Sequence, residues 1–324
     1  MAVTGKFGIN NATALVPLCD GWVLYNDRTT NKIQAANVID KYLGTSYALT
    51  ARPDDLAYDP STGLLYATLD TGVSGGVSAI AVINLNTSVV SYIPLPASGW
   101  RIAAANGGRA FITLDSSYHW SDETILYVNG SAGTTLASMA VTGFNGNAMV
   151  ACNSAGTTVY VGVIGGSNYP TKQYSFNTST YAFTLQQTAP GTYDTNGEEM
   201  RLSPDGNHLV FVNGGGNGGV YSIYDLNPTN INNNLGGWNT GAYPQGAAFS
   251  PDSANFATSN GSDLLVFGVT SHASSKAAWV GANGGGIDNI SRTAFSTGGG
   301  FVYGLVTDFG STTAPATIVW ETFP

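Results

Sequence analysis

Short runs of alternating apolar and polar residues, each introduced by a polar turn, recur along the whole chain. Residues 201–214 read RLSPDGNHLVFVNG, and residues 248–261 read AFSPDSANFATSNG. A period of two is typical of strands whose side chains alternate between two faces, and β-branched and aromatic residues favour strands. Because no stretch shows a sustained helical period, the pattern predicts an all-β chain.

The turn-and-strand unit occurs seven times. The last apolar residues before the turns are Leu18, Tyr58, Ala104, Cys152, Leu202, Phe249 and Phe295. Successive gaps between them are 40, 46, 48, 50, 47 and 46 residues. Repeats of this length are typical of propeller blades with four strands each. The spacing predicts a seven-bladed β-propeller of four-stranded antiparallel blades, formed by residues 1–324 as a single domain.

The two ends of the chain predict how the ring closes. After Phe295 there is room for a second strand at 301–308 and a third at 316–323, but not for a fourth. The segment AVTGKFGI at 2–9 alternates as a strand does. We therefore predict that residues 2–9 pair with 316–323 and complete the last blade, which removes two exposed sheet edges. The alternative is a flexible N-terminal arm.

Aromatic residues on the strand after each turn mark the predicted core. We expect most of them to pack between adjacent blades; they are Tyr66, Phe111, Tyr160, Phe211, Phe256 and Tyr303. The two cysteines, Cys19 and Cys152, fall on inner strands of the first and fourth blades. Those blades lie nearly opposite each other, too far apart for the roughly 7 Å that a disulfide spans. We therefore predict two free, buried thiols.

Several motifs resemble a known group of repeats. They are RLSPDG at 201–206, VYSIYDLN at 220–227 and YPQGAAFSPD at 243–252. Together they resemble the YVTN-type and WD-repeat-like β-propellers. The resemblance covers essentially the whole chain and concerns architecture, since neither a Trp-Asp dipeptide nor a Gly-His pair stands where a true WD repeat has one. It implies a propeller without indicating a subfamily.

Charge and hydropathy restrict the partners. The net charge of −9 disfavours phosphate backbones, so no nucleic acid partner is expected. No apolar run is long enough for a membrane helix, so membrane insertion is not expected, and the start does not read as a secretory signal. Low charge with abundant Gly, Asn and Tyr is common in virion and surface proteins. We predict a virion or extracellular location without a classical signal, with the cytoplasm as the alternative.

The sequence lacks the usual motifs for catalysis and cofactor binding. Its three histidines, His119, His208 and His272, belong to different blades and are not spaced as metal ligands. The glycine-rich segment at 214–219 has no helix after it to form a phosphate site. We expect no cofactor and no resident metal. A weaker alternative is a calcium ion at Asp115, Asp122 and Glu123.

Loops that join each outermost strand to the next innermost strand meet at one mouth of a propeller channel. Such loops carry function more often than the fold does. The candidate binding residues at this mouth are Arg52, Trp100, Arg101, Phe144, Glu198, Arg201, Tyr243 and Arg292. Arginines interleaved with carboxylates favour ion pairs between neighbouring blades, and a ligand site is the alternative.

The loop 115–123, between a second and a third strand, is a further candidate surface. It places Tyr118, His119 and Trp120 in succession. Three consecutive large side chains cannot all point inward from a loop, and exposed aromatics mark interaction surfaces. We predict that Trp120 contacts a partner chain or stacks on a glycan. The alternative is that Trp120 folds back over its own blade.

These features favour a non-enzymatic structural or binding propeller, such as a bacteriophage decoration or receptor-binding component of a virion. Its partner would be a protein in a larger assembly or a surface glycan. One alternative is a lactonase-like enzyme, but such propellers bring Glu, Arg and His together at the channel mouth, and these mouth loops contain no His. The other alternative is a surface glycan-binding lectin.

Overall fold

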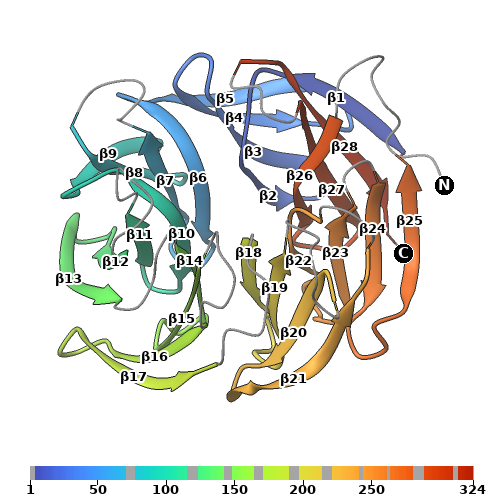
Figure 1. The fold of residues 1–324 in the computed structure, drawn as a ribbon. Coiled ribbons are helices and arrows are strands. Elements are labelled where there is room, and N and C mark those ends of the chain that lie inside the picture. The colour runs from blue at the N-terminus through green and yellow to red at the C-terminus, as the bar shows by residue number, and fades with distance from the viewer. Residues whose placement is uncertain are drawn as a thin grey trace.

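The computed structural model describes residues 4–70, 77–114, 123–141, 148–163, 171–189, 197–213, 221–240, 244–260, 263–279, 288–308 and 313–323. They form seven four-stranded antiparallel sheets arranged as blades around a central channel (Figure 1). No α-helix occurs in these ranges, and so none there could cross a membrane. The predicted seven-bladed all-β propeller is confirmed.

Each blade runs from an inner strand beside the channel to an outer strand at the rim. Blades 1 and 2 contain β2 (Leu15–Cys19), β3 (Trp22–Asp27), β4 (Lys32–Asn37), β5 (Tyr42–Ala48), β6 (Arg52–Asp59), β7 (Leu64–Asp70), β8 (Ala79–Asn84) and β9 (Val89–Pro94). Blades 3 and 4 contain β10 (Gly99–Ala105), β11 (Arg109–Leu114), β12 (Glu123–Asn129), β13 (Thr134–Val141), β14 (Ala148–Cys152), β15 (Thr158–Val163), β16 (Lys172–Asn177) and β17 (Ala182–Thr188). Blades 5 and 6 contain β18 (Gly197–Leu202), β19 (Leu209–Asn213), β20 (Ile223–Asn227), β21 (Asn230–Trp238), β22 (Ala248–Phe249), β23 (Asn255–Ser259), β24 (Asp263–Gly268) and β25 (Ser274–Trp279).

Blade 7 is built from both ends of the chain. It contains β26 (Asp288–Phe295), β27 (Phe301–Asp308), β28 (Ala316–Thr322) and, as its outer strand, β1 (Gly5–Ile9). Gly5 pairs with Trp320 and Ile9 with Ala316, which confirms the predicted closure over the described residues. A side chain at Gly5 would collide with the indole ring of Trp320, so this pairing requires glycine.

The core consists of side chains packed between neighbouring blades. The six predicted core aromatics are at most 3% exposed: Tyr66, Phe111, Tyr160, Phe211, Phe256 and Tyr303. Tyr66 of blade 2 packs with Ile102 and Ala110 of blade 3, and Tyr303 of blade 7 packs with Val23 of blade 1. The core prediction is therefore confirmed.

Polar side chains on the second strands tie each of three blades to the next. Thr113 donates a hydrogen bond from Oγ1 to the Ala148 carbonyl at 2.8 Å, joining blades 3 and 4. Ser259 donates from Oγ to the Ile290 carbonyl at 2.9 Å, joining blades 6 and 7. Asn26 donates from Nδ2 to the Asp54 carbonyl at 2.9 Å, joining blades 1 and 2. These bonds satisfy inner-strand carbonyls that face a neighbouring blade.

The cysteine prediction is half right. Both thiols are free, as expected, but Cys19 is exposed and Cys152 is only half-buried. The register of β2 shifts between Pro17 and Cys19, and such a bulge turns the following side chain out of the strand's regular alternation. Cys152 instead turns toward blade 3, where its thiol contacts the Ala104 carbonyl, and burial raises the pKa of Cys152 to about 12.

Candidate functional site

Irregular pairing near the start of several inner strands sets the geometry of the channel mouth. The register shifts between Pro53 and Leu56 in β6 and between Gly99 and Ile102 in β10. It also shifts between Gly197 and Glu199 in β18 and between Ile290 and Arg292 in β26. Bulges redirect side chains, and here charged residues gather beside a narrow gap in the channel. We call Asp55, Arg101, Glu199, Arg201 and Arg292 the channel belt.

Both carboxylates of the channel belt hold neighbouring blades together. Glu199 accepts a hydrogen bond at Oε2 from the Ala247 N–H at 2.8 Å, and its Oε1 forms an ion pair with Arg201. Asp55 accepts at Oδ2 from the Ile102 N–H at 3.2 Å. Each carboxylate therefore bonds the backbone of the next blade, a bond that is strong because the acceptor is charged.

Arg101 is the least satisfied member of the channel belt. Its guanidinium makes no ion pair or side-chain hydrogen bond with any residue that the structure describes, and its Nε atom is buried without a partner. The guanidinium carbon lies 4.5 Å from the centre of the Trp100 ring, a cation–π contact. Burial lowers the pKa of Arg101 and repulsion from Arg292 lowers it further, while the charges of Asp55, Asp54 and Glu199 act in the opposite direction. The channel belt itself contains three arginines and two carboxylates, one more basic than acidic group.

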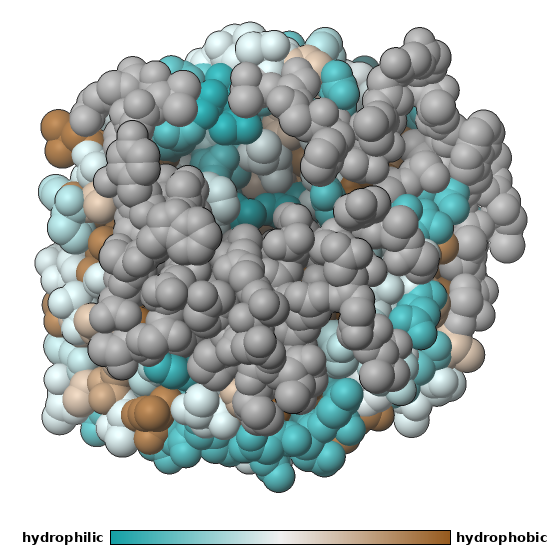
Figure 2. Space-filling model, in the orientation of Figure 1, coloured by the Kyte–Doolittle hydropathy of each residue, from teal (hydrophilic) through white to brown (hydrophobic). Residues whose placement is uncertain are grey.

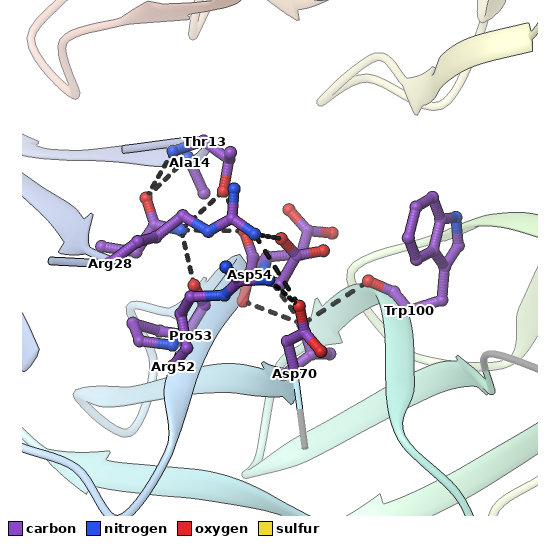
Figure 3. A network of polar contacts seen from close by, with 11 residues as sticks. Thr13, Ala14, Arg28, Arg52, Pro53, Asp54, Asp70 and Trp100 are labelled. Carbon is purple, nitrogen blue, oxygen red and sulfur yellow. Dashed lines mark hydrogen bonds and ion pairs between the residues drawn. The ribbon is translucent and has the colours of Figure 1, made fainter. Parts of the chain in front are cut away.

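A second group of charges lies between blades 1 and 2, next to the channel belt (Figure 3). Arg28 approaches Asp54 to 3.3 Å and Asp70 to 3.9 Å, and Arg52 pairs with Asp70. Burial is the main cause that lowers the pKa of Arg28. An ion pair between blades is therefore present at Arg28, which was not predicted, whereas the pairs of the predicted Arg52 and Arg201 each lie within one blade. Sequence reasoning missed Arg28 because it follows a second strand, and that loop set was searched for aromatics.

The structure brings together only part of the predicted channel-mouth set. Arg101, Arg201 and Arg292 share the narrow gap, Trp100 contacts Arg101, and Arg52 belongs to the second group of charges. Glu198 lies in β18, but its side chain is outside the described part of the structure. Five further candidates lie outside the described residues, and their roles stay predictions: Tyr118, His119, Trp120, Phe144 and Tyr243.

A third polar cluster joins blades 5 and 6 at the turns that follow the other ends of the strands. Asp225 of β20 is fully buried, and its Oδ2 contacts His208 Nδ1 at 2.8 Å and His272 Nε2 at 3.1 Å. The hydrogen bond to Asp225 is the main cause that raises the pKa of His208. Within the described ranges, no group of three or more His, Cys, Asp or Glu residues could hold a metal ion. This contact could not be predicted from the sequence, because His272 lies 47 residues from Asp225.

Comparisons with known proteins identify the fold and no family. No protein-family model matches the chain, and no curated protein matches its sequence. Among solved structures, the chain is similar to hydrazine synthase from Kuenenia stuttgartiensis, with a TM-score of 0.67 at 11% identity over 94% of this chain and 97% of that one. In all, 1303 chains of solved structures match. A fold so widely shared hosts many functions, so function must be argued from the sites.

Proposed function

We propose that this chain is a non-enzymatic binding propeller that joins a larger particle, as a virion decoration or receptor-binding subunit. One observation supports it most: the rim of blade 1 exposes three large apolar side chains within five residues. Ile39, Tyr42 and Leu43 are 43%, 48% and 54% exposed. Single apolar residues on a surface are ordinary, whereas several exposed ones on one strand and the turn before it mark a candidate interaction site. We call these three residues the blade 1 rim patch.

The blade 1 rim patch adjoins a groove between blades 7 and 1. The groove has a volume of about 390 Å³ and is lined by Phe7, Tyr25 and Leu43, among others. Tyr42 stands on the opposite face of the same sheet, because consecutive strand residues alternate, and its ring packs edge-on against Trp22 at 5.3 Å. A partner could therefore contact both faces of the outer strand β5.

The rest of the described surface is less concentrated. Figure 2 shows hydrophobic side chains on the described part of one face as separate spots near the rim. On blade 4, Tyr181 and Leu185 are exposed, but they are two residues instead of three, and Tyr181 stacks on Tyr127. The described carboxylates of the channel belt bond backbone groups, which favours a structural role for them. The repeat motifs suggest, as part of this proposal, kinship with YVTN-type propellers.

The test is incorporation into particles. Particles from the producing culture are separated on a density gradient and probed with an antibody against the chain. We expect the chain in the particle fraction, and its presence only as a free monomer would contradict the proposal. Hydrolysis of sugar lactones, or binding on a glycan array with unchanged particle content, would favour the lactonase-like or lectin alternative instead.

A matched pair of variants tests the blade 1 rim patch itself. Leu43→Ser removes an anchor that is 54% exposed, and Leu185→Ser removes one that is 52% exposed on blade 4. We expect Leu43→Ser to weaken incorporation by roughly thirty-fold, the usual cost of losing an interface anchor of about 2 kcal/mol, and Leu185→Ser to leave it unchanged. Tyr118→Ala and Trp120→Ala test the loop 115–123 in the same assay.

A further inference from the structure

The channel widens next to the channel belt into a cavity of about 410 Å³. Its lining includes Pro60, Pro204 and Thr297, which belong to the turns after the inner strands, so its outer end lies at the face opposite the channel mouth. The volume lies within the roughly 300–1,000 Å³ of small-molecule sites. Such sites combine apolar walls with a few placed polar groups.

Small residues at one position of the repeat create this space. The residue before the last apolar residue of the inner strand lines the cavity in all seven blades, and these residues are Pro17, Ala57, Ala103, Ala151, Arg201, Ala248 and Ala294. An alanine side chain ends at Cβ, so the blades with alanine leave room that a larger residue would fill. Blade 5 alone places a guanidinium there. Packing between blades does not require a charged side chain at this position, so Arg201 indicates a further role.

Arg201 connects the cavity to the channel belt. Its side chain is 38% exposed, and it lines both the cavity and the narrow gap that Arg101 and Arg292 share. That gap measures about 10 Å³, close to the space that one water molecule occupies. A single oxygen atom could enter it from the cavity. Arginine is suited to such a site because its planar fork of donors matches a carboxylate.

The charges around the gap favour an anion. Arg101 has no ion pair among the described residues; Arg292 repels it, and Asp55, Asp54 and Glu199 attract it without pairing with it. Asp55 and Glu199 already accept backbone hydrogen bonds, and Glu199 also pairs with Arg201. The chain carries six arginines, and five of them lie in the channel belt or the adjoining group, although the net charge is −9. Only Arg109 lies elsewhere, where it donates to the Ala155 carbonyl.

We infer that the channel binds a small monocarboxylate with an apolar body. The apolar chain lies against the alanine wall, and the carboxylate meets Arg201 and turns one oxygen toward Arg101. The Cys152 thiol on the same wall stays neutral, because burial raises the pKa of that thiol to about 12, so it adds no competing negative charge. This inference does not depend on the proposed assembly role, since the blade 1 rim patch lies at the other edge of the sheets.

Binding of octanoate, measured by calorimetry and by the rise in melting temperature, tests the inference. Octanamide has the same chain without the charge, and acetate has the same head group without the chain. We expect octanoate to bind and to raise the melting temperature with concentration. Octanamide and acetate should each bind at least roughly tenfold more weakly, as expected when one charged contact or the apolar contact is lost.

Variants locate the site. Arg201→Ala gives blade 5 the residue of its neighbours and should lower octanoate affinity at least roughly tenfold, the loss of one charge-assisted contact. Ala151→Leu narrows the cavity and should weaken octanoate and octanamide alike, while Arg109→Ala serves as the matched arginine control. If Arg201→Ala fails to fold, Arg101→Gln repeats the test within the channel belt. Equal binding of octanoate and octanamide, or an unchanged affinity in Arg201→Ala, would overturn the inference, and neither result would alter incorporation into particles.

Discussion

Blades 1 and 2 are joined by arginines that pair with aspartates, whereas blades 5 and 6 are joined by one aspartate that two histidines contact. At the first joint Arg28 and Arg52 face Asp54 and Asp70, and the side chains are 10% to 24% exposed. At the second joint a fully buried Asp225 faces His208 and His272. Arginine stays protonated at all relevant pH values, while histidine changes charge between about pH 5 and 8.

The same repeat therefore joins its blades in two ways, and the two joints respond differently to salt and pH. Both joints bury carboxylates between blades, and both satisfy them with cationic or potentially cationic side chains. The arginine joint is partly open to solvent, so dissolved salt weakens it. In the histidine joint the carboxylate of Asp225 is fully buried, although His208 and His272 are 18% and 22% exposed, so salt weakens this joint less and pH acts on it through His208. Three predictions test this difference between the two joints.

The largest effect is expected from Asp225→Ala. It leaves the ring N–H groups of His208 and His272 without their shared acceptor in a buried site, where each unsatisfied donor is costly. We expect the free energy of unfolding to fall by about 3 kcal/mol, in the range for a broken buried network. Urea denaturation measures it, and Asp40→Ala in an exposed turn is the control, with an expected change within about 0.5 kcal/mol. A loss under about 1 kcal/mol would show that this carboxylate does not hold the joint.

A smaller loss is expected from Arg28→Gln. It removes the partner of Asp54 but leaves Arg52 on Asp70, so stability should fall by about 1–2 kcal/mol at low salt. The loss should shrink near 1 M sodium chloride, where screening acts over roughly 3 Å. Tyr303→Phe is the control for salt: it removes a neutral hydrogen bond, accepted from the Gly21 N–H at 2.9 Å, and should cost about 1 kcal/mol at either salt concentration. An Arg28→Gln effect that is independent of salt would contradict the solvent-screened joint.

The smallest effect is a pH dependence carried by His208. The hydrogen bond to Asp225, followed by the charges of Asp225 and Asp205, raises the folded-state pKa of His208 above 6.5 despite its burial. A group with a raised pKa contributes stability below its unfolded pKa, and that stability is lost as pH rises through the folded pKa. His208→Gln should therefore destabilise the protein more at about pH 6 than at about pH 9. Melting temperatures across this range give the answer, and equal losses at both ends would refute it.

Much of the fold follows from local pattern, because alternation and turn chemistry repeat in every blade. Tyr66 and Phe256 could be assigned to the core from their distance to the preceding turn. The pairing of 2–9 with 316–323 could be predicted because the last repeat is one strand short. Cys19 could not be placed, since a one-residue bulge reverses the alternation on which the prediction depended. The contact of Asp225 with His272 joins a strand to a turn of the next blade, so no periodic signal precedes it.

The candidate site was predictable in composition but not in arrangement. The arginines of the channel mouth were found because inner strands begin there. Bulges in β10, β18 and β26 decide which of these arginines share one gap. The residue types in these strands do not predict the bulges. The unusual residue type at position 201 could have been recognised from the sequence. Aligning the ends of the inner strands sets it against Ala151, Ala248 and Ala294, and the exception then stands out.

The strand that closes blade 7 also fixes the order of events during synthesis. β1 leaves the ribosome before every other strand, and its partner β28 leaves after all of them, with Ile9 and Ala316 paired across the whole chain. At about 5–20 residues per second, the segment Gly5–Ile9 waits roughly 15–60 s for its partner. During that time blades 1 to 6 can form in turn, while β1 presents an unpaired backbone to any strand it meets. Closure of the ring by β1 and β28 therefore follows the synthesis of blades 1 to 6, and it is the step at which a chaperone would protect the chain most.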